Sequence, residues 1–261
     1  IVLLEMGVVG AAIGTAVGYL IGSIGPTIYF IKKKTGNIFF TKPTKDPKSV
    51  LFSCYNGLSE FLGNISNSIV GIIVNLYALK FYGEIGVSCY GIIMYVILIF
   101  ISIYIGICTG TTPYVGYNYG AKNTDELKNI LKKVMIVITI SSISMVLLGI
   151  ALSKPIAIIY SGGNQELLDL TEKAMFDFSF CFAFCGFSMF ASNFFTGLGN
   201  GTISAVISFL RTFVFQILAI VLLPIIFNSH DALWFFGLAQ EALAFIVSIS
   251  LLLIYKKKYN Y

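Results

Sequence analysis

The stretch Asn56-Gly-Leu-Ser-Glu-Phe-Leu-Gly-Asn-Ile-Ser-Asn67 decides how the chain folds. It lies in the run 49–79, which is long enough to cross a bilayer and whose only charged residue is Glu60. At about 100° per residue, four polar side chains share one stripe of a helix: Asn56, Glu60, Asn64 and Asn67. Because a carboxylate is costly in hydrocarbon, Glu60 must face protein or water. The stripe predicts the wall of a cavity in which Glu60 binds a cation; the alternative is a buried polar seam between two helices.

Composition places the chain among integral membrane proteins. Apolar residues make up 57% of it and charged residues only 11%, whereas soluble domains carry about a quarter charged residues. The mean hydropathy is +0.89. Since no alternation of period 2 runs through the apolar segments, the spans are expected to be helices and not barrel strands.

Apolar runs of about 20 residues predict an all-α membrane protein with seven transmembrane helices. The runs are roughly 1–31, 49–79, 85–113, 134–153, 174–197, 202–227 and 232–255. The basic segment 32–48, with two prolines, is expected to be a cytoplasmic linker between two helical bundles.

The connecting segments sort by charge, and the sorting predicts the orientation. One side carries 14 of the 17 basic residues, and the other side carries only Lys80, Lys154 and Lys173. The positive-inside rule makes the first side cytoplasmic, with residue 1 outside the cell and the carboxy terminus in the cytoplasm. A start outside the cell and within an apolar run indicates a fragment of a longer protein.

The segment after the third run is polar and rich in tyrosine. Pro113 lacks a backbone donor, so a kink is expected there, and the glycines that follow permit a tight exit from the helix. Tyr117 and Asn118 lie just beyond. This end is expected to form a cytoplasmic gate or an interfacial tyrosine belt.

The later spans carry few polar residues. Asn123 and Glu126 predict the start of a short amphipathic helix along the inner membrane surface. The fourth span is expected to end near Pro155, and a polar outer loop to follow over 161–172. Arg211 and Glu241 lie at middle depths of consecutive spans, which predicts a neutralising structural pair.

Enzymatic chemistry is not indicated. The five cysteines lie in apolar runs and are interpreted as small hydrophobic residues, so neither a disulfide framework nor a metal site is expected. The only histidine is His230, and no HExxH motif is present. No catalytic residues, cofactor or nucleic-acid partner are expected, and a pure scaffold would not need Glu60 within its polar stripe.

Several segments together resemble one family of transporters. The run 113–123, Pro-Tyr-Val-Gly-Tyr-Asn-Tyr-Gly-Ala-Lys-Asn, resembles the eighth-helix signature of multidrug and toxic compound extrusion (MATE) transporters. Further similar segments follow the family's helix order: 56–62, 87–92, 195–200, 208–211 and 233–241. The resemblance covers nearly the whole chain.

This resemblance implies a twelve-helix protein of two six-helix lobes. Residues 1–31 would be the last helix of the amino-terminal lobe, and 49–261 the six-helix carboxy-terminal lobe, with the rest of the amino-terminal lobe as a missing partner. Glu60 matches the seventh-helix acid that some Na⁺-coupled members use for the cation, and Asp177 is a possible match for their tenth-helix acid. Thr112 stands where many members have Gln before the proline, which puts gating or substrate choice in doubt.

The expected function is therefore secondary active antiport in the plasma membrane. Drugs or amphipathic organic cations would leave the cell in exchange for Na⁺ or H⁺ by alternating access. The alternative is a flippase for lipid-linked oligosaccharides of the same superfamily, which basic residues lining the interior would favour; only Arg211 is a candidate.

Overall fold

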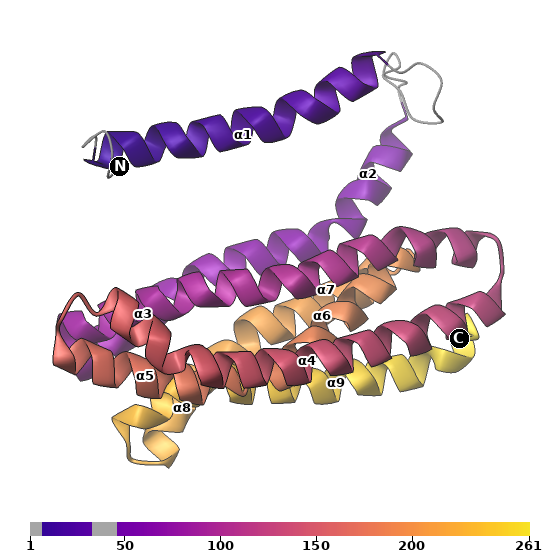
Figure 1. The fold of residues 1–261 in the computed structure, drawn as a ribbon. Coiled ribbons are helices and arrows are strands. Elements are labelled where there is room, and N and C mark those ends of the chain that lie inside the picture. The colour runs from indigo at the N-terminus through magenta and orange to yellow at the C-terminus, as the bar shows by residue number, and fades with distance from the viewer. Residues whose placement is uncertain (1–6, 33–45) are drawn as a thin grey trace. The chain divides into compact units, whose positions relative to one another are not determined.

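The structure, a computed structural model, describes residues 7–32 and 46–261 (Figure 1). It divides into two units, Ile1–Lys48 and Ser49–Tyr261. In the first unit, α1 (Gly7–Lys32) is a helix of 26 residues that contains Pro26. Most of the predicted linker, residues 33–45, lies outside the described residues.

The second unit is built from helices. In chain order they are α2 (Pro47–Asn56, which begins before the boundary), α3 (Leu58–Gly120), α4 (Thr124–Tyr160), α5 (Gln165–Ser179), α6 (Phe182–Gly197), α7 (Gly201–Phe209), the π-helix η1 (Leu210–Val214), α8 (Phe215–Ile226), the 3-10 helix η2 (His230–Phe235) and α9 (Phe236–Tyr259). No strand occurs within 7–32 or 46–261.

The element α3 is a hairpin of two long arms. Its 63 residues would extend about 95 Å as one straight helix, roughly three times the thickness of a hydrocarbon core. The chain instead turns at Gly83, where φ is 63° and ψ is −151°. A side chain is rarely tolerated at such a positive φ, whereas glycine adopts it readily. The turn separates the predicted spans 49–79 and 85–113.

The predicted all-helical membrane fold is confirmed. Within the described residues, five helices are long and apolar enough to cross a membrane, or six if α5 and α6, which meet at a bend of 50°, form one span. The stretch 61–120 is a single helix in that count, although the turn at Gly83 divides it. The expected number of seven crossings stays a prediction.

Three local predictions around α4 are wrong. The predicted helix start is confirmed, since the Asn123 side chain accepts a hydrogen bond from the Glu126 amide at 3.2 Å, but the helix is continuous from Thr124 to Tyr160, so its amphipathic beginning is not a separate helix. Pro155 lies inside it, because a membrane helix tolerates proline where its neighbours satisfy the freed backbone groups. The predicted loop 161–172 is mostly the start of α5, whose first turn is capped by Asn164 accepting a hydrogen bond from the Leu167 amide at 3.2 Å.

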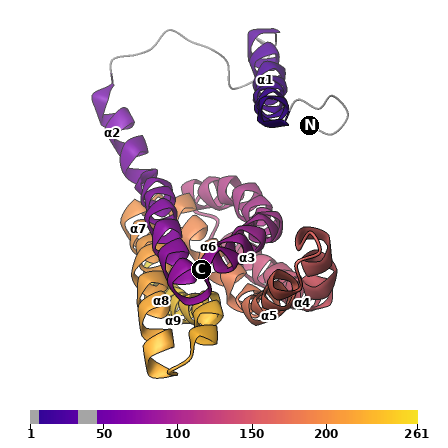
Figure 2. The ribbon, with the colours of Figure 1, turned by 90° about the vertical axis from the view of Figure 1, so that its left-hand side faces the viewer.

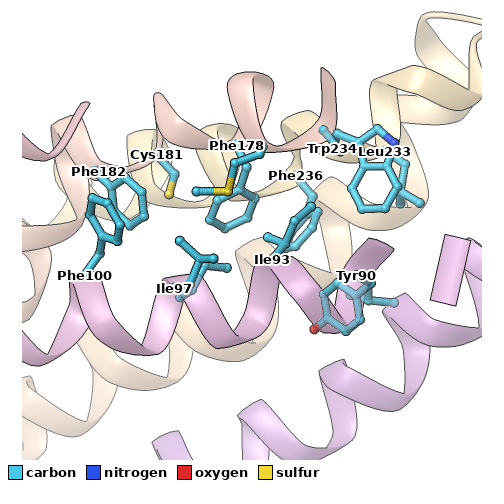
Figure 3. Packing of buried hydrophobic residues seen from close by; sticks show 14 of the residues in the cluster. Tyr90, Ile93, Ile97, Phe100, Phe178, Cys181, Phe182, Leu233, Trp234 and Phe236 are labelled. Atoms are coloured by element: carbon cyan, nitrogen blue, oxygen red, sulfur yellow. The ribbon is translucent and has the colours of Figure 1, made fainter. Parts of the chain in front are cut away.

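The centre of the second unit is α6. It packs against α3, α4, α7 and α9, and Figure 2 shows α7, α8 and α9 on one side of it with α4 and α5 on the other. Apolar residues of the second arm of α3, among them Ile97 and Phe100, pack against residues of the elements opposite, including Phe178 of α5, Phe182 of α6 and Phe236 of α9 (Figure 3). The rings of Phe100 and Phe182 stack with centroids 4.9 Å apart. Such close packing holds helices together where lipid removes the hydrophobic driving force.

Candidate functional site

Two residues of the polar stripe, Asn64 and Asn67, lie on the first arm of α3 and point away from the helices of the second unit. This arm packs inward through residues four apart, among them Ser66, Val70 and Val74, which are all buried. Asn67 lies about 100° and Asn64 about 160° around the helix from Ser66. Both amides are exposed. Within the described second unit, neither is therefore buried in a seam between helices.

The two proposed coupling acids, Glu60 of α3 and Asp177 of α5, lie near opposite ends of that arm. Glu60 is in the first turn of α3 and Tyr82 is at the end of the arm, about 33 Å further along the helix axis. Tyr82 donates a hydrogen bond of 2.8 Å to Asp231, and Asp231 interacts electrostatically with Asp177. By this spacing, the backbone of Glu60 lies far along the helix axis from the end of the arm where Asp177 is found. The side chains of Glu60 and Asn56 lie outside the described residues.

Asp177 instead belongs to a group that we call the outer polar cluster: Tyr82, Lys173, Asp177 and Asp231. These residues come from the end of the first arm of α3, from α5 and from η2. The Lys173 ammonium forms an ion pair with Asp231, and Asp177 is 8% exposed one helical turn after Lys173. The cluster therefore ties together the ends of three elements near the turn at Gly83.

The structure does bring Arg211 and Glu241 together. Arg211 Nη2 lies 2.8 Å from Glu241 Oε1, and Arg211 Nε lies 3.0 Å from both carboxylate oxygens. Their side chains are only 14% and 6% exposed. Arg211 is held by η1, a short π-helix within the span formed by α7 and α8. Because π-turns interrupt membrane helices mostly at functional positions, this central ion pair is a second candidate site.

Three neighbours of the central ion pair were missed by sequence reasoning. Ser188 Oγ lies 2.9 Å from Glu241 Oε2, Cys185 Sγ lies 3.3 Å from Arg211 Nη2, and Gln240 Nε2 lies 3.4 Å from Glu241 Oε1. Gln240 is next to Glu241 in an apolar run, and this position could have indicated that it contributes to the same polar site. Serine and cysteine are ordinary residues in membrane helices, so nothing in the sequence marked the other two.

The segment 113–123 contains the carboxy-terminal end of α3, and the helix continues through Pro113. Among the described residues of α3, only Gly83 has backbone angles outside the helical range. The kink expected at Pro113 is therefore not seen as a change in backbone angles. Tyr117 is 76% exposed. Asn118 is buried; its side chain donates to the Tyr114 carbonyl at 2.9 Å, and its own carbonyl accepts from the Asn123 amide at 2.9 Å. Asn118 thus stabilises the carboxy-terminal end of the helix.

This segment also makes a close approach between α3 and α6. A Cβ atom on Gly197 would lie 3.0 Å from the Val115 side chain and 3.1 Å from the Thr112 carbonyl oxygen. A Cβ on Gly116 would lie 3.3 Å from the Gly197 carbonyl oxygen. The glycines of the quoted segments therefore let two helices meet at short distance, as small residues do in membranes.

No metal centre emerges from the described residues. Among them, no three His, Cys, Asp or Glu side chains gather in a group that could hold a metal ion. Cys54 is exposed, and the other four cysteines are buried.

Curated proteins with a similar sequence are named as multidrug exporters. The multidrug export protein MepA of Staphylococcus saprophyticus subsp. saprophyticus is 32% identical over 147 residues, which are 55% of this chain and 32% of MepA. MepA of Staphylococcus aureus is 33% identical over 134 residues, 50% of this chain and 29% of that protein. The chain thus matches about a third of the length of these relatives.

Solved structures share the fold at low identity. The outward-facing conformation of a multidrug resistance MATE family transporter of the MOP superfamily gives a TM-score of 0.88 at 20% identity, over 99% of this chain and 58% of that chain. A crystal structure of MATE in complex with MaL6 gives 0.84 at 20% identity, over 100% and 58%. The MatE family model matches residues 61–222, which is more than half of the chain. By this match, the chain belongs to the MatE family.

Proposed function

We propose that this chain is part of a secondary active antiporter, not an enzyme, that exports drugs or amphipathic organic cations in exchange for Na⁺ or H⁺. The observation that carries the proposal is the MatE match over residues 61–222, together with relatives named as multidrug export proteins. This chain spans 58% of each of the two solved MATE structures, and we propose that further helices of the same transporter complete it. The substrate pathway is proposed to run between the two parts.

The polar stripe on α3 is proposed as one wall of that pathway. Asn64 and Asn67 are exposed on a face that the second unit does not cover, as a wall facing another lobe requires. Glu60 continues the same stripe and is proposed as the coupling acid, which binds the cation when ionised. Release of the cation is then coupled to substrate expulsion by a rearrangement of helices, which alternates access between the two sides.

The other predicted residues receive separate roles. Asp177 is proposed to act in the outer polar cluster, apart from Glu60, because about 33 Å of helix axis separates Glu60 from Tyr82 of that cluster. The segment with Pro113, Tyr117 and Asn118 is proposed as a gate on the lysine-rich side, which we assign to the cytoplasm of a plasma-membrane protein.

The structure does not favour the flippase alternative. That activity calls for basic residues that face the interior, and Arg211 was the only candidate in the sequence. Its guanidinium is neutralised by Glu241 at 2.8 Å. A paired and largely buried arginine offers little free positive charge to an anionic lipid-linked sugar.

Dye efflux from proteoliposomes tests the proposal. The full-length transporter that contains this chain is reconstituted, and efflux of a fluorescent cationic dye is followed under an imposed Na⁺ gradient and, separately, a pH gradient. We expect one gradient to drive efflux and the Glu60→Gln variant to lose this dependence, because glutamine cannot bind or release the coupling cation as a carboxylate does.

Glu84→Gln is the matched control. Glu84 lies on the same element, is exposed just after the turn at Gly83, and is not on the polar stripe. Its variant should retain gradient-driven efflux. If Glu60→Gln behaves like Glu84→Gln, Glu60 is not the coupling acid. If neither gradient drives efflux in the wild type, antiport itself is rejected.

A further inference from the structure

A cavity of about 540 Å³ lies between the beginning of α4 and the end of α9. Its lining combines three ammonium groups with apolar side chains: Lys128, Lys132 and Lys256, and Leu131, Met135, Ile249, Leu252, Leu253 and Tyr261. The volume is within the range of small-molecule sites in proteins. The pathway proposed above does not involve this cavity, which lies on different elements from the polar stripe.

The ammonium groups lie toward one end of each helix, with Leu131 and Tyr261 among them, and the other apolar lining residues lie toward the middle of the helices. On α4, the lining runs from Lys128 in the first turns to Met135, about 10 Å further toward the middle of the helix. On α9, it runs in the opposite chain direction, from Lys256 in the last turn back to Ile249. Both helices thus present ammonium groups at the same end of the cavity and apolar groups at the other. This polarity matches an amphiphile with an anionic head and an apolar tail.

Two of the three ammonium groups are available to a ligand. Lys128 lies 3.4 Å from Asp125 in an exposed pair, whereas Lys132 and Lys256 form no ion pair with any described carboxylate. Both of these lysines are exposed. The Tyr261 phenol is neutral, because its ordinary pKa is already well above neutral pH and burial raises that pKa further. Its hydroxyl donates to the Leu252 carbonyl at 2.8 Å, which fixes this part of the cavity wall.

The surroundings of the cavity are those of a lipid-facing surface. The exposed residues of α4 beyond the cavity are mostly apolar, and include Ile136, Ile140 and Leu147. Ile246 and Ile254 of α9 are similarly exposed. An acyl chain that entered the apolar end would therefore continue along the hydrocarbon core, while the head group stayed at the interface.

We propose that this cavity binds an anionic phospholipid, with its phosphate between Lys132 and Lys256 and an acyl chain against the apolar residues. Basic pockets between transmembrane helices at an interface hold anionic head groups in this way. This proposal differs from a general attraction to a basic surface. It requires Lys132 and Lys256, which line the cavity, and not the neighbouring Lys133 and Lys257, which do not.

Lipid retention on the purified full-length protein tests the site. The protein is extracted in detergent, incubated with phosphatidylglycerol or with phosphatidylethanolamine of the same acyl chains, and analysed by native mass spectrometry. The double variant Lys132→Gln/Lys256→Gln is compared with Lys133→Gln/Lys257→Gln. The control removes the same charge from neighbouring positions of the same two helices that do not line the cavity.

We expect the wild type and the control to retain phosphatidylglycerol over phosphatidylethanolamine. The cavity variant should bind phosphatidylglycerol at least about tenfold more weakly, since each lysine near an anionic lipid contributes roughly a tenfold factor or somewhat less. Equal losses in both double variants would show a diffuse electrostatic attraction and overturn the site. Equal retention of the two lipids by the wild type would overturn it as well.

Discussion

The contact between Arg211 and Glu241 shows what an ionisable residue requires inside a membrane protein. Either charge alone would be expensive among the buried side chains of α6, α7 and α9. Together they share three short contacts, and Ser188 lies within hydrogen-bonding distance of a carboxylate oxygen. The pair therefore depends on both partners, and removal of one leaves the other uncompensated.

Replacing Arg211 alone should be more harmful than replacing both partners. We expect Arg211→Met to lower the free energy of unfolding by about 3–5 kcal/mol, because Glu241 would remain buried and unpaired. The double variant Arg211→Met/Glu241→Leu should recover part of that loss. The measurement is chemical denaturation in detergent, with Lys128→Ala as the control that breaks an exposed pair and should cost about 0–1 kcal/mol. A double variant no more stable than Arg211→Met would contradict this account.

The sequence predicted part of the candidate sites at this scale. Arg211 and Glu241 stood out because charged residues are rare in apolar runs, and periodicity placed Asn64 and Asn67 on one helical face. The separation of Glu60 from Asp177 could not be read in the same way, because it depends on the direction in which α3 and α5 run. The apolar surroundings also gave no signal for Ser188 or Cys185.

At the scale of the elements, the hydrophobic runs predicted where the long helices lie more accurately than they predicted where those helices begin and end. The turn at Gly83 falls between two predicted spans, because Glu84 and the glycine interrupt the apolar run. The beginning of α5 was predicted as a loop because its exposed face is polar; only its buried residues, such as Thr171 and Ala174, reveal the helix. The π-helix η1, which contains Arg211, has no sequence periodicity from which it could be predicted.

The close approach of α3 and α6 predicts a difference between two glycines. Gly197→Ala should lower the free energy of unfolding by about 1–3 kcal/mol, since the new Cβ would lie 3.0 Å from Val115 and 3.1 Å from the Thr112 carbonyl oxygen. The control Gly110→Ala lies within α3 with nothing within 4 Å of its Cβ, and should stabilise the helix by about 0.5–1 kcal/mol. Thermal unfolding in detergent measures both. Equal effects of the two substitutions would show that helix contact is not the cause.

At the scale of the whole molecule, the exposed polar residues of α3 are explained if a second lobe packs against that face. The second unit encloses its own core around α6, yet leaves Asn64 and Asn67 of the polar stripe exposed. The matched MATE structures are longer, and this chain spans 58% of each. An exposed polar face within an otherwise apolar unit is consistent with a wall that another lobe completes.

The orientation of the whole protein can be tested by labelling from one side. In the full-length transporter with Cys54→Ser, which removes the exposed native thiol, single cysteines are placed by Glu166→Cys near the start of α5 and by Lys257→Cys at the end of α9. Since the seven predicted spans place 14 of the 17 basic residues on the side of Lys257, that side should be cytoplasmic. A membrane-impermeant maleimide added to intact cells should therefore label the cysteine at 166, and the cysteine at 257 only after permeabilisation. The reverse pattern would invert the topology and place the proposed lipid site in the outer leaflet, whereas labelling of both positions in intact cells would show that the two helix ends do not lie on opposite sides.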